Sequence, residues 1–168
     1  YGVSDEKLSA TKKLEAELLE FLKFPRGVEL NYEDACGNYN VGALEAEHEE
    51  KIAEDYGDVV FLQKFPQRTH PFWNMKHFGN GIFNKVDVLL HGMETIGSAE
   101  RSINAGEMRK NFMTLSGGRY AGLLFEQFGK DRVMKELDDY LSLTMFPRFG
   151  GGIGVTRMAR AMKMQGLL

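Results

Sequence analysis

The stretch that decides the fold reads Val86-Asp-Val-Leu-Leu-His-Gly-Met-Glu-Thr-Ile-Gly-Ser-Ala-Glu-Arg101. Its apolar run is interrupted at His91-Gly92 and then resumes, which predicts two antiparallel strands joined by a two-residue turn. Residues 81–90 are apolar at enough positions on both faces to form a central strand, and residues 59–64 predict another. The sheet is therefore expected to be largely antiparallel.

Two acidic side chains are expected to share one face of this hairpin. In the predicted register Leu89 faces Glu94, and Asp87 is the diagonal neighbour of Glu94 on the same face. At a diagonal separation of roughly 7 Å, the two carboxylates can approach one or two Mg²⁺ ions whose other ligands are phosphate and water. A surface hairpin with solvated charges is the alternative.

A basic residue follows on the second strand. Arg101 lies beyond the small residues Gly97-Ser98-Ala99, which leave room for a ligand and make Ser98 a candidate lining residue. A guanidinium group at this place can hold a substrate carboxylate through two hydrogen bonds.

The segment Gly150-Gly-Gly-Ile-Gly-Val-Thr-Arg157 combines glycines with an arginine at the start of a predicted helix. Without Cβ atoms the backbone can pass close under an adenine ring, and Arg157 would meet phosphate at the helix start. The lysine of a P-loop is absent, and a plain strand-to-helix turn is the alternative. Arg148 is a further candidate for contact with a carboxylate or a nucleotide, against a solvent role. The candidate nucleotide-binding residues are Glu94, Gly150, Gly151, Gly152, Gly154 and Arg157.

Together these blocks resemble the catalytic core of the class II aminoacyl-tRNA synthetases, in the aspartyl and asparaginyl branch. The segments Glu45-Ala-Glu-His-Glu49, Phe65-Pro66 and Pro71-Phe-Trp-Asn-Met75 are similar to other blocks of that branch and stand in the same order. The resemblance covers roughly residues 40–168. It implies an α+β fold in which an antiparallel sheet is flanked by helices.

The resemblance also implies roles for individual residues. Asp87 and Glu94 would hold Mg²⁺ and ATP, Arg101 would bind the side-chain carboxylate of aspartate, and Arg157 would contact the γ-phosphate. Arg68, His70 and Phe72 are candidates to line the amino-acid pocket, with a surface loop as the alternative for the first two and plain packing for Phe72. Glu100 is the candidate to meet ammonium.

Within that superfamily, the chain is most similar to the ammonia-dependent asparagine synthetases, including asparagine synthetase A and its archaeal-type relatives. Gly-Gly-Gly-Ile-Gly and the following Val155-Thr-Arg157 differ from the usual synthetase sequence, as does Glu94-Thr-Ile-Gly-Ser-Ala-Glu-Arg101. The implied function is an AMP-forming ligase that makes asparagine from aspartate, ammonia and ATP. The alternatives are an aspartyl- or asparaginyl-tRNA synthetase, with tRNA as a partner, and a non-catalytic paralogue that binds a nucleotide, an amino acid or a regulatory partner.

Motif 1, which builds the family's dimer interface, and motif 2, whose arginine grips the α-phosphate, are not visible. We therefore expect residues 1–168 to form the C-terminal part of a single catalytic domain. The resemblance further implies a homodimer.

Composition fits a soluble globular protein in a reducing cytoplasm. The 168 residues are 43% hydrophobic, enough for one packed core, and the net charge of −3 provides no overall basic field for nucleic acid. The single cysteine, Cys36, is expected to be packed in a reduced protein, and no apolar run is long enough for a membrane span. The four histidines lack the spacing of a zinc site.

The remaining pattern predicts helices separated by polar loops. A helix is expected over residues 5–23, a loop over 36–42, and a charged helix over 44–56. Helices are also expected over 119–128, 131–143 and 156–164, whereas 107–115 is ambiguous.

Overall fold

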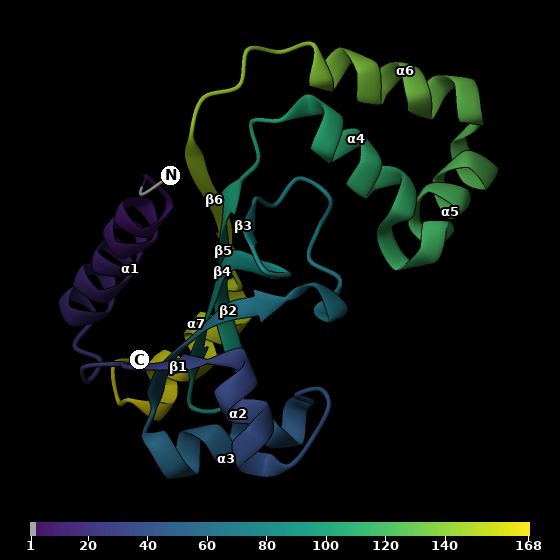
Figure 1. The fold of residues 1–168 in the computed structure, drawn as a ribbon. Coiled ribbons are helices and arrows are strands. Elements are labelled where there is room, and N and C mark those ends of the chain that lie inside the picture. The colour runs from purple at the N-terminus through teal and green to yellow at the C-terminus, as the bar shows by residue number, and fades with distance from the viewer. Residues whose placement is uncertain (1–2) are drawn as a thin grey trace.

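The computed structural model describes residues 3–168, with side chains from residue 9 onward. Its centre is a six-stranded sheet in the order β1-β2-β4-β5-β6, with β3 paired to β4 (Figure 1). Only β1 and β2 run parallel, which confirms the prediction of a largely antiparallel sheet. The strands are β1 (Val28–Asn31), β2 (Val59–Pro66), β3 (His77–Gly79), β4 (Ile82–Leu90), β5 (Glu94–Arg101) and β6 (Arg148–Ile153).

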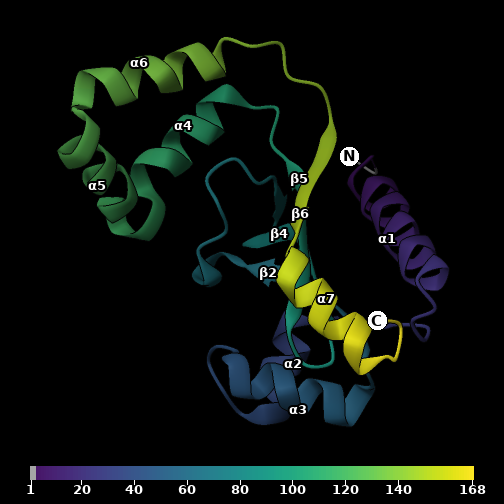
Figure 2. The same cartoon turned by 180° about the vertical axis from the view of Figure 1, so that it is seen from behind.

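Helices cover both faces of the sheet because the central strands are apolar on both sides. One buried cluster joins β2, β4 and β5 to α1 (Val3–Phe21) and α7 (Val155–Met164). The other joins β1, β2 and β4 to α2 (Tyr32–Tyr39) and α3 (Ala46–Tyr56). We call the first face the α1 face and the second the site face. Figure 2, the view from behind, shows α7 packed over the strands.

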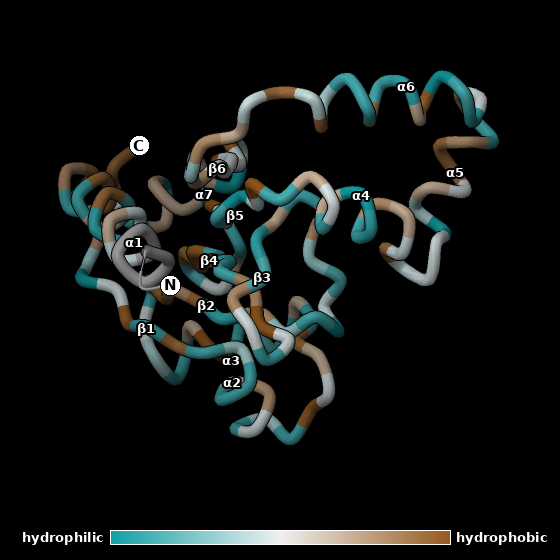
Figure 3. The backbone as a smooth tube through the Cα atoms, turned by 45° about the horizontal axis from the view of Figure 1, so that its top comes forward, coloured by the Kyte–Doolittle hydropathy of each residue, from teal (hydrophilic) through white to brown (hydrophobic). Residues whose placement is uncertain are grey.

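Three helices are inserted between β5 and β6, and both views show them projecting beyond the sheet (Figures 1 and 2). They are α4 (Ala105–Thr114), α5 (Arg119–Phe128) and α6 (Lys130–Leu141). Their own small core is formed by Phe112, Ala121, Val133 and Leu137. Figure 3 shows hydrophobic stretches in the strands and a largely hydrophilic α6.

Several expected elements agree with the structure, one does not, and the alternative reading of the glycine run is excluded. The helix expected over 119–128 is α5, and the ambiguous segment is the helix α4. The predicted loop over 36–42 is partly wrong, because α2 continues to Tyr39 and ends at Asn40 in the left-handed conformation. The glycine run is extended strand rather than a turn, because β5 offers it a partner along its length.

No helix among the described residues is long and apolar enough to cross a membrane.

Candidate active site

The site is built on the hairpin between β4 and β5. His91 and Gly92 both have positive φ (48° and 73°), as a tight turn that matches the strand twist requires. Leu90 and Met93 close the turn through hydrogen bonds of 2.9 and 3.3 Å. The predicted pairing of Leu89 with Glu94 is confirmed.

The two predicted carboxylates converge above a glycine. A bulge after Val88 shifts the register, so that Asp87 lies opposite Gly97. A Cβ atom at position 97 would lie 2.8 Å from Glu94 Oε1 and 3.4 Å from Asp87 Oδ1. Position 97 therefore needs to be glycine for both carboxylates to occupy this place.

The surroundings of Asp87 suit a carboxylate that binds a cation. It is 5% exposed, and its Oδ1 has no hydrogen-bond partner among the described residues, while Oδ2 pairs with Lys85. Burial is the main cause that raises the pKa of Asp87 to about 6; the ammonium group of Lys85 opposes this, and the charge of Glu94 adds to it. A cation at Oδ1 would remove both the unsatisfied acceptor and the repulsion.

A third carboxylate, which lies in the charged helix expected over residues 44–56, stands beside them. Glu49 of α3 accepts a hydrogen bond from the backbone N–H of Glu94 (3.1 Å), and burial raises the pKa of Glu49. Its signal in the sequence was the acidic block Glu45–Glu49. Glu49 thus ties the start of β5 to α3.

The donor set fits Mg²⁺ that is shared with a phosphate ligand. Within the described residues no group of three or more His, Cys, Asp or Glu side chains is placed to enclose a metal ion. Asp87 and Glu94 provide two carboxylates on one face. Mg²⁺ is commonly held by one or two carboxylates together with water and substrate phosphates, so these residues suit it.

The glycine segment extends the floor of the site. In β6, Gly152 lies opposite Gly97 and Gly150 lies opposite Ala99, so both are on the site face. A Cβ atom at Gly152 would meet nothing within 4 Å, whereas one at Gly151, on the α1 face, would lie 2.6 Å from the carbonyl oxygen of Gly97. The strand therefore presents bare backbone beside the carboxylates.

Arg157 stands in the first turn of α7 at the end of this floor. Its Nη1 donates to the backbone carbonyl of Glu94 (2.8 Å) and lies 4.0 Å from Glu94 Oε2. A Cβ atom at Gly154 would lie 3.2 Å from Arg157 Cδ, so the glycine gives the side chain room. The side chain is half exposed, which leaves donors accessible to a ligand.

Arg101 lies at the other end of β5, on the same face as Gly97. It donates to Asn74 Oδ1 (3.1 Å) and to the carbonyl oxygen of Gly150 (3.0 Å). Burial lowers the pKa of Arg101, and the nearby charge of Arg148 contributes in the same direction. Sequence reasoning did not select Asn74 as a site residue, although it belongs to the quoted block Pro71–Met75.

Ser98 and Glu100 do not join this site, contrary to expectation. Side chains alternate along a strand, so these two residues point to the α1 face, opposite to Arg101. Ser98 donates to Glu15 Oε1 of α1 (2.8 Å). Glu100 is 1% exposed and binds Lys76 Nζ and Asn84 Nδ2, both at 2.9 Å.

His70 and Phe72 do line a cavity that reaches the acidic residues. Its volume is about 280 Å³, and its wall also includes Glu49, Lys85 and Asp87. His70 has positive φ (51°) and ends a short 3-10 helix over residues 67–69, which turns the following chain toward the sheet. His70 and Phe72 therefore lie at the same cavity as Asp87, and their role in binding an amino acid stays a prediction.

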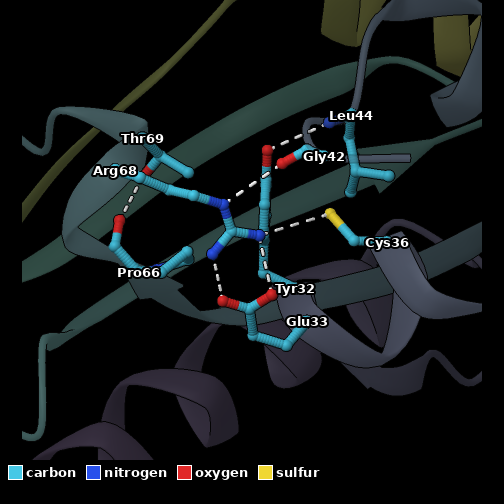
Figure 4. Close-up of polar contacts among 8 residues, drawn as sticks. All are labelled: Tyr32, Glu33, Cys36, Gly42, Leu44, Pro66, Arg68 and Thr69. Carbon is cyan, nitrogen blue, oxygen red and sulfur yellow. Dashed lines mark hydrogen bonds and ion pairs between the residues drawn. The ribbon is translucent and has the colours of Figure 1, made fainter. Parts of the chain in front are cut away.

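Arg68, the other candidate near this pocket, points toward α2 (Figure 4). Its guanidinium group binds both carboxylate oxygens of Glu33, and its Nε donates to the carbonyl oxygen of Gly42 (3.1 Å). The sulfur of Cys36 lies 3.8 Å from Nη2; Cys36 is buried, and burial raises its pKa. Arg68 therefore ties the loop before His70 to α2.

Comparison with known proteins agrees with this geometry. The family described as tRNA synthetases class II (D, K and N) matches residues 5–166. No curated protein matches the chain.

Solved structures of related enzymes share the fold. An asparaginyl-tRNA synthetase from Entamoeba histolytica, in complex with asparaginyl-adenylate, has a TM-score of 0.64 at 16% identity, over 97% of this chain and 41% of its own. The aspartyl-tRNA synthetase of the same organism has a TM-score of 0.60 at 22% identity, over 83% and 29%. An asparaginyl-tRNA synthetase from Pyrococcus horikoshii, also with asparaginyl-adenylate, has 0.60 at 20% identity, over 83% and 32%.

The chain spans less than half the length of each of these proteins. The family pattern nevertheless covers nearly all of its residues, and the sheet flanked by helices is the one expected for this family. The chain therefore belongs to the class II tRNA synthetases (D, K and N), and its fold is the catalytic fold of that family.

Proposed function

We propose that the protein is an ATP-dependent ligase that makes asparagine from aspartate and ammonia and releases AMP and pyrophosphate. The observation that carries the proposal is the arrangement of Asp87, Glu94, Arg157 and Arg101 along one face, over a floor of glycines. The four groups are complementary to a magnesium-nucleotide and to an anionic amino acid. In this proposal residues 1–168 supply the C-terminal part of one catalytic domain.

The nucleotide end of the site is the carboxylate pair. Asp87 and Glu94 would hold Mg²⁺, Arg157 would hold the γ-phosphate, and the bare backbone at Gly152 would lie under the adenine. Gly150 lies under the guanidinium group of Arg101 instead. Bound Mg²⁺ neutralises phosphate charge and favours the departure of pyrophosphate. Arg157 is already tied to Glu94, so the cationic and anionic parts of the site are positioned together.

The amino-acid end of the site is Arg101. Its position is four residues from Gly97, or roughly 13 Å along a strand that rises about 3.4 Å per residue. Aspartate has two carboxylates. The one that Arg101 holds is therefore not the one that reacts beside Asp87 and Glu94. Asparagine formation requires the β-carboxylate to react, so Arg101 would hold the α-carboxylate; in a tRNA synthetase it would hold the side chain.

The reaction needs positioning and charge neutralisation rather than covalent help from the protein. The β-carboxylate oxygen of aspartate attacks the α-phosphorus of ATP, pyrophosphate leaves, and β-aspartyl-adenylate forms. The nitrogen of ammonia then attacks the acyl carbon, AMP leaves with the bridging oxygen, and one proton passes to solvent. Arg101 orients the substrate through both steps.

The ammonia-ligase reading is favoured by the sequence of the glycine segment, Gly-Gly-Gly-Ile-Gly-Val-Thr-Arg, and by a net charge of −3. The solved structures named above favour the second candidate, an aspartyl- or asparaginyl-tRNA synthetase. Both candidates use ATP and an amino acid at the same face. From the family resemblance we also propose a cytoplasmic homodimer, which light scattering after size-exclusion chromatography tests.

The deciding experiment uses the protein at its full natural length with aspartate, Mg-ATP and ammonium, without tRNA. Equimolar asparagine and AMP are expected, with loss of both in Arg101→Ala. Arg119→Ala is the matched control, because Arg119 is exposed on the inserted helices. Pyrophosphate exchange without asparagine would instead favour the tRNA synthetase, and no turnover in either assay would favour the non-catalytic paralogue.

A further inference from the structure

We propose that Arg148 is a second substrate-binding residue, which grips the non-reacting carboxylate together with Arg101 and makes the site select an acid over its amide. The inference rests on the proposed function and adds a specificity-determining residue to that site.

The first support is the register of β5 and β6. Arg101 and Arg148 are directly opposite each other, so their side chains leave the same face of the sheet. Like charges at such a pair repel each other and destabilise the sheet. A retained pair of cations at one place suits an anion that binds between them.

The second support is the nature of their partners. Among the described residues, the hydrogen bonds of both guanidinium groups go to uncharged oxygens: Arg101 to Asn74 and Gly150, and Arg148 to the carbonyl of Phe146 and the hydroxyl of Tyr140, both at 3.2 Å. A guanidinium group has five N–H donors, so each retains donors for a ligand.

The neighbouring carboxylate does not neutralise the pair. Glu100 precedes Arg101 in the chain, but its side chain lies on the α1 face and is bound by Lys76. The burial that lowers the pKa of Arg101 acts together with the charge of Arg148, as expected for two cations in a partly dehydrated place.

The third support is that the partner of Arg148 packs against the residue that precedes the partner of Arg101 in the chain. Tyr140 of α6, which binds Arg148, packs edge-on against Trp73 with ring centroids 5.4 Å apart. Trp73 precedes Asn74, which binds Arg101. The inserted helix α6 therefore contacts Arg148 directly and, through Trp73, the segment that carries Asn74.

The chemistry of this pair discriminates between an acid and an amide. Two guanidinium groups offer only N–H donors, which a carboxylate accepts with both oxygens. A carboxamide would direct its own NH₂ group toward those donors and would leave hydrogen bonds unmade. The pair should therefore favour aspartate in either orientation over an analogue that presents an amide at this end.

The test is equilibrium binding, followed by the intrinsic fluorescence to which Trp73, the one tryptophan in residues 1–168, contributes. The full-length protein is titrated with L-aspartate and with two amides, L-asparagine and L-isoasparagine, in the presence of Mg²⁺ and a non-hydrolysable ATP analogue. Isoasparagine has its amide at the α-carboxyl group, so one of the two amides faces the arginines in either substrate orientation. Arg148→Met is compared with Arg119→Met as the exposed control and with Arg148→Lys, which keeps the charge.

In the wild type we expect the facing amide to bind more weakly than aspartate. Arg148→Met should weaken aspartate about 10- to 100-fold and that amide much less, so that the ratio of the two Kd values falls. Arg148→Lys should give an intermediate ratio, and Arg119→Met no change. An unchanged ratio in a folded Arg148→Met protein, or an equal loss for all ligands, would overturn the proposal.

Failure of this inference can be told apart from failure of the proposed function. Asparagine formation with an unchanged binding ratio in Arg148→Met would reject the arginine pair alone. A changed ratio without asparagine formation would support the pair and reject the ligase. A wild-type protein that binds none of the three ligands would reject both.

Discussion

Arg157 and Glu94 are joined by a hydrogen bond of 2.8 Å from the guanidinium Nη1 to the backbone carbonyl. This bond connects the first turn of α7 to the first residue of β5, although 63 positions separate them in the chain. The proposed phosphate-binding cation is thereby fixed beside the carboxylate pair before a ligand binds.

Arg157→Ala should lower kcat about 100- to 1000-fold, the usual effect of removing one preorganised group that stabilises transition-state charge. Its effect on thermal stability should be small, because the side chain is half exposed. Steady-state kinetics with ATP and thermal unfolding check this, with Lys163→Ala on the exposed side of α7 as control. An unchanged kcat would remove Arg157 from the site.

Asp87→Asn should raise the Mg²⁺ concentration needed for half-maximal activity and lower kcat by at least about 10-fold, because a carboxylate ligand with an unsatisfied oxygen is replaced by a neutral amide. Activity as a function of Mg²⁺ concentration is the measurement. Asp131→Asn, at an exposed position of α6, should follow the wild-type curve. The same Mg²⁺ dependence in Asp87→Asn would contradict the proposed metal site.

Gly152→Ala separates binding from folding. A methyl group there meets nothing within 4 Å in the free protein, so the free energy of unfolding should change by less than about 0.5 kcal/mol. The methyl group would stand on the proposed adenine floor and should raise the KM for ATP several-fold. Gly122→Ala in α5, also in open space, is the control. Unchanged KM in Gly152→Ala would place the nucleotide elsewhere.

The hairpin and its carboxylates could be predicted from the sequence because the determinants are local. A two-residue turn sets the pairing of Leu89 with Glu94, and alternation then places Asp87 on the same face. The predicted helices in the insertion followed in the same way from their apolar spacing.

The partners supplied by distant segments could not be predicted in this way. Asn74 and Glu49 reach the site through tertiary contacts that no local pattern encodes. Arg148 is a candidate from the sequence, but its pairing with Arg101 depends on the register of two distant strands. The positions of Ser98 and Glu100 could have been corrected by applying strand alternation from Arg101. Both residues are an odd number of positions away from Arg101, so their side chains must leave the opposite face of the strand.

Glu100→Gln should act on stability rather than on ammonia. The carboxylate is buried in an ion pair with Lys76 and accepts from Asn84, so its loss should cost about 1–3 kcal/mol. Urea unfolding measures this, and the KM for ammonium should stay the same in the folded variant. A raised KM for ammonium without a loss of stability would return Glu100 to the catalytic site.

Glu15 makes stability depend on pH. Burial raises the pKa of Glu15 in the folded state, and its Oε2 lacks a hydrogen bond among the described residues. The folded state therefore prefers the protonated acid. The stabilisation that follows from this preference is fully present below the unfolded pKa of Glu15, near 4.5, and is lost as pH rises through the higher folded pKa. Glu15→Gln should match the wild type near pH 4 and be more stable at pH 7 by about 1–2 kcal/mol. Urea unfolding at both pH values tests this, with the exposed Glu17→Gln as control. Equal stabilities of the wild type and Glu15→Gln at pH 7 would show that burial of the ionised Glu15 does not destabilise the fold.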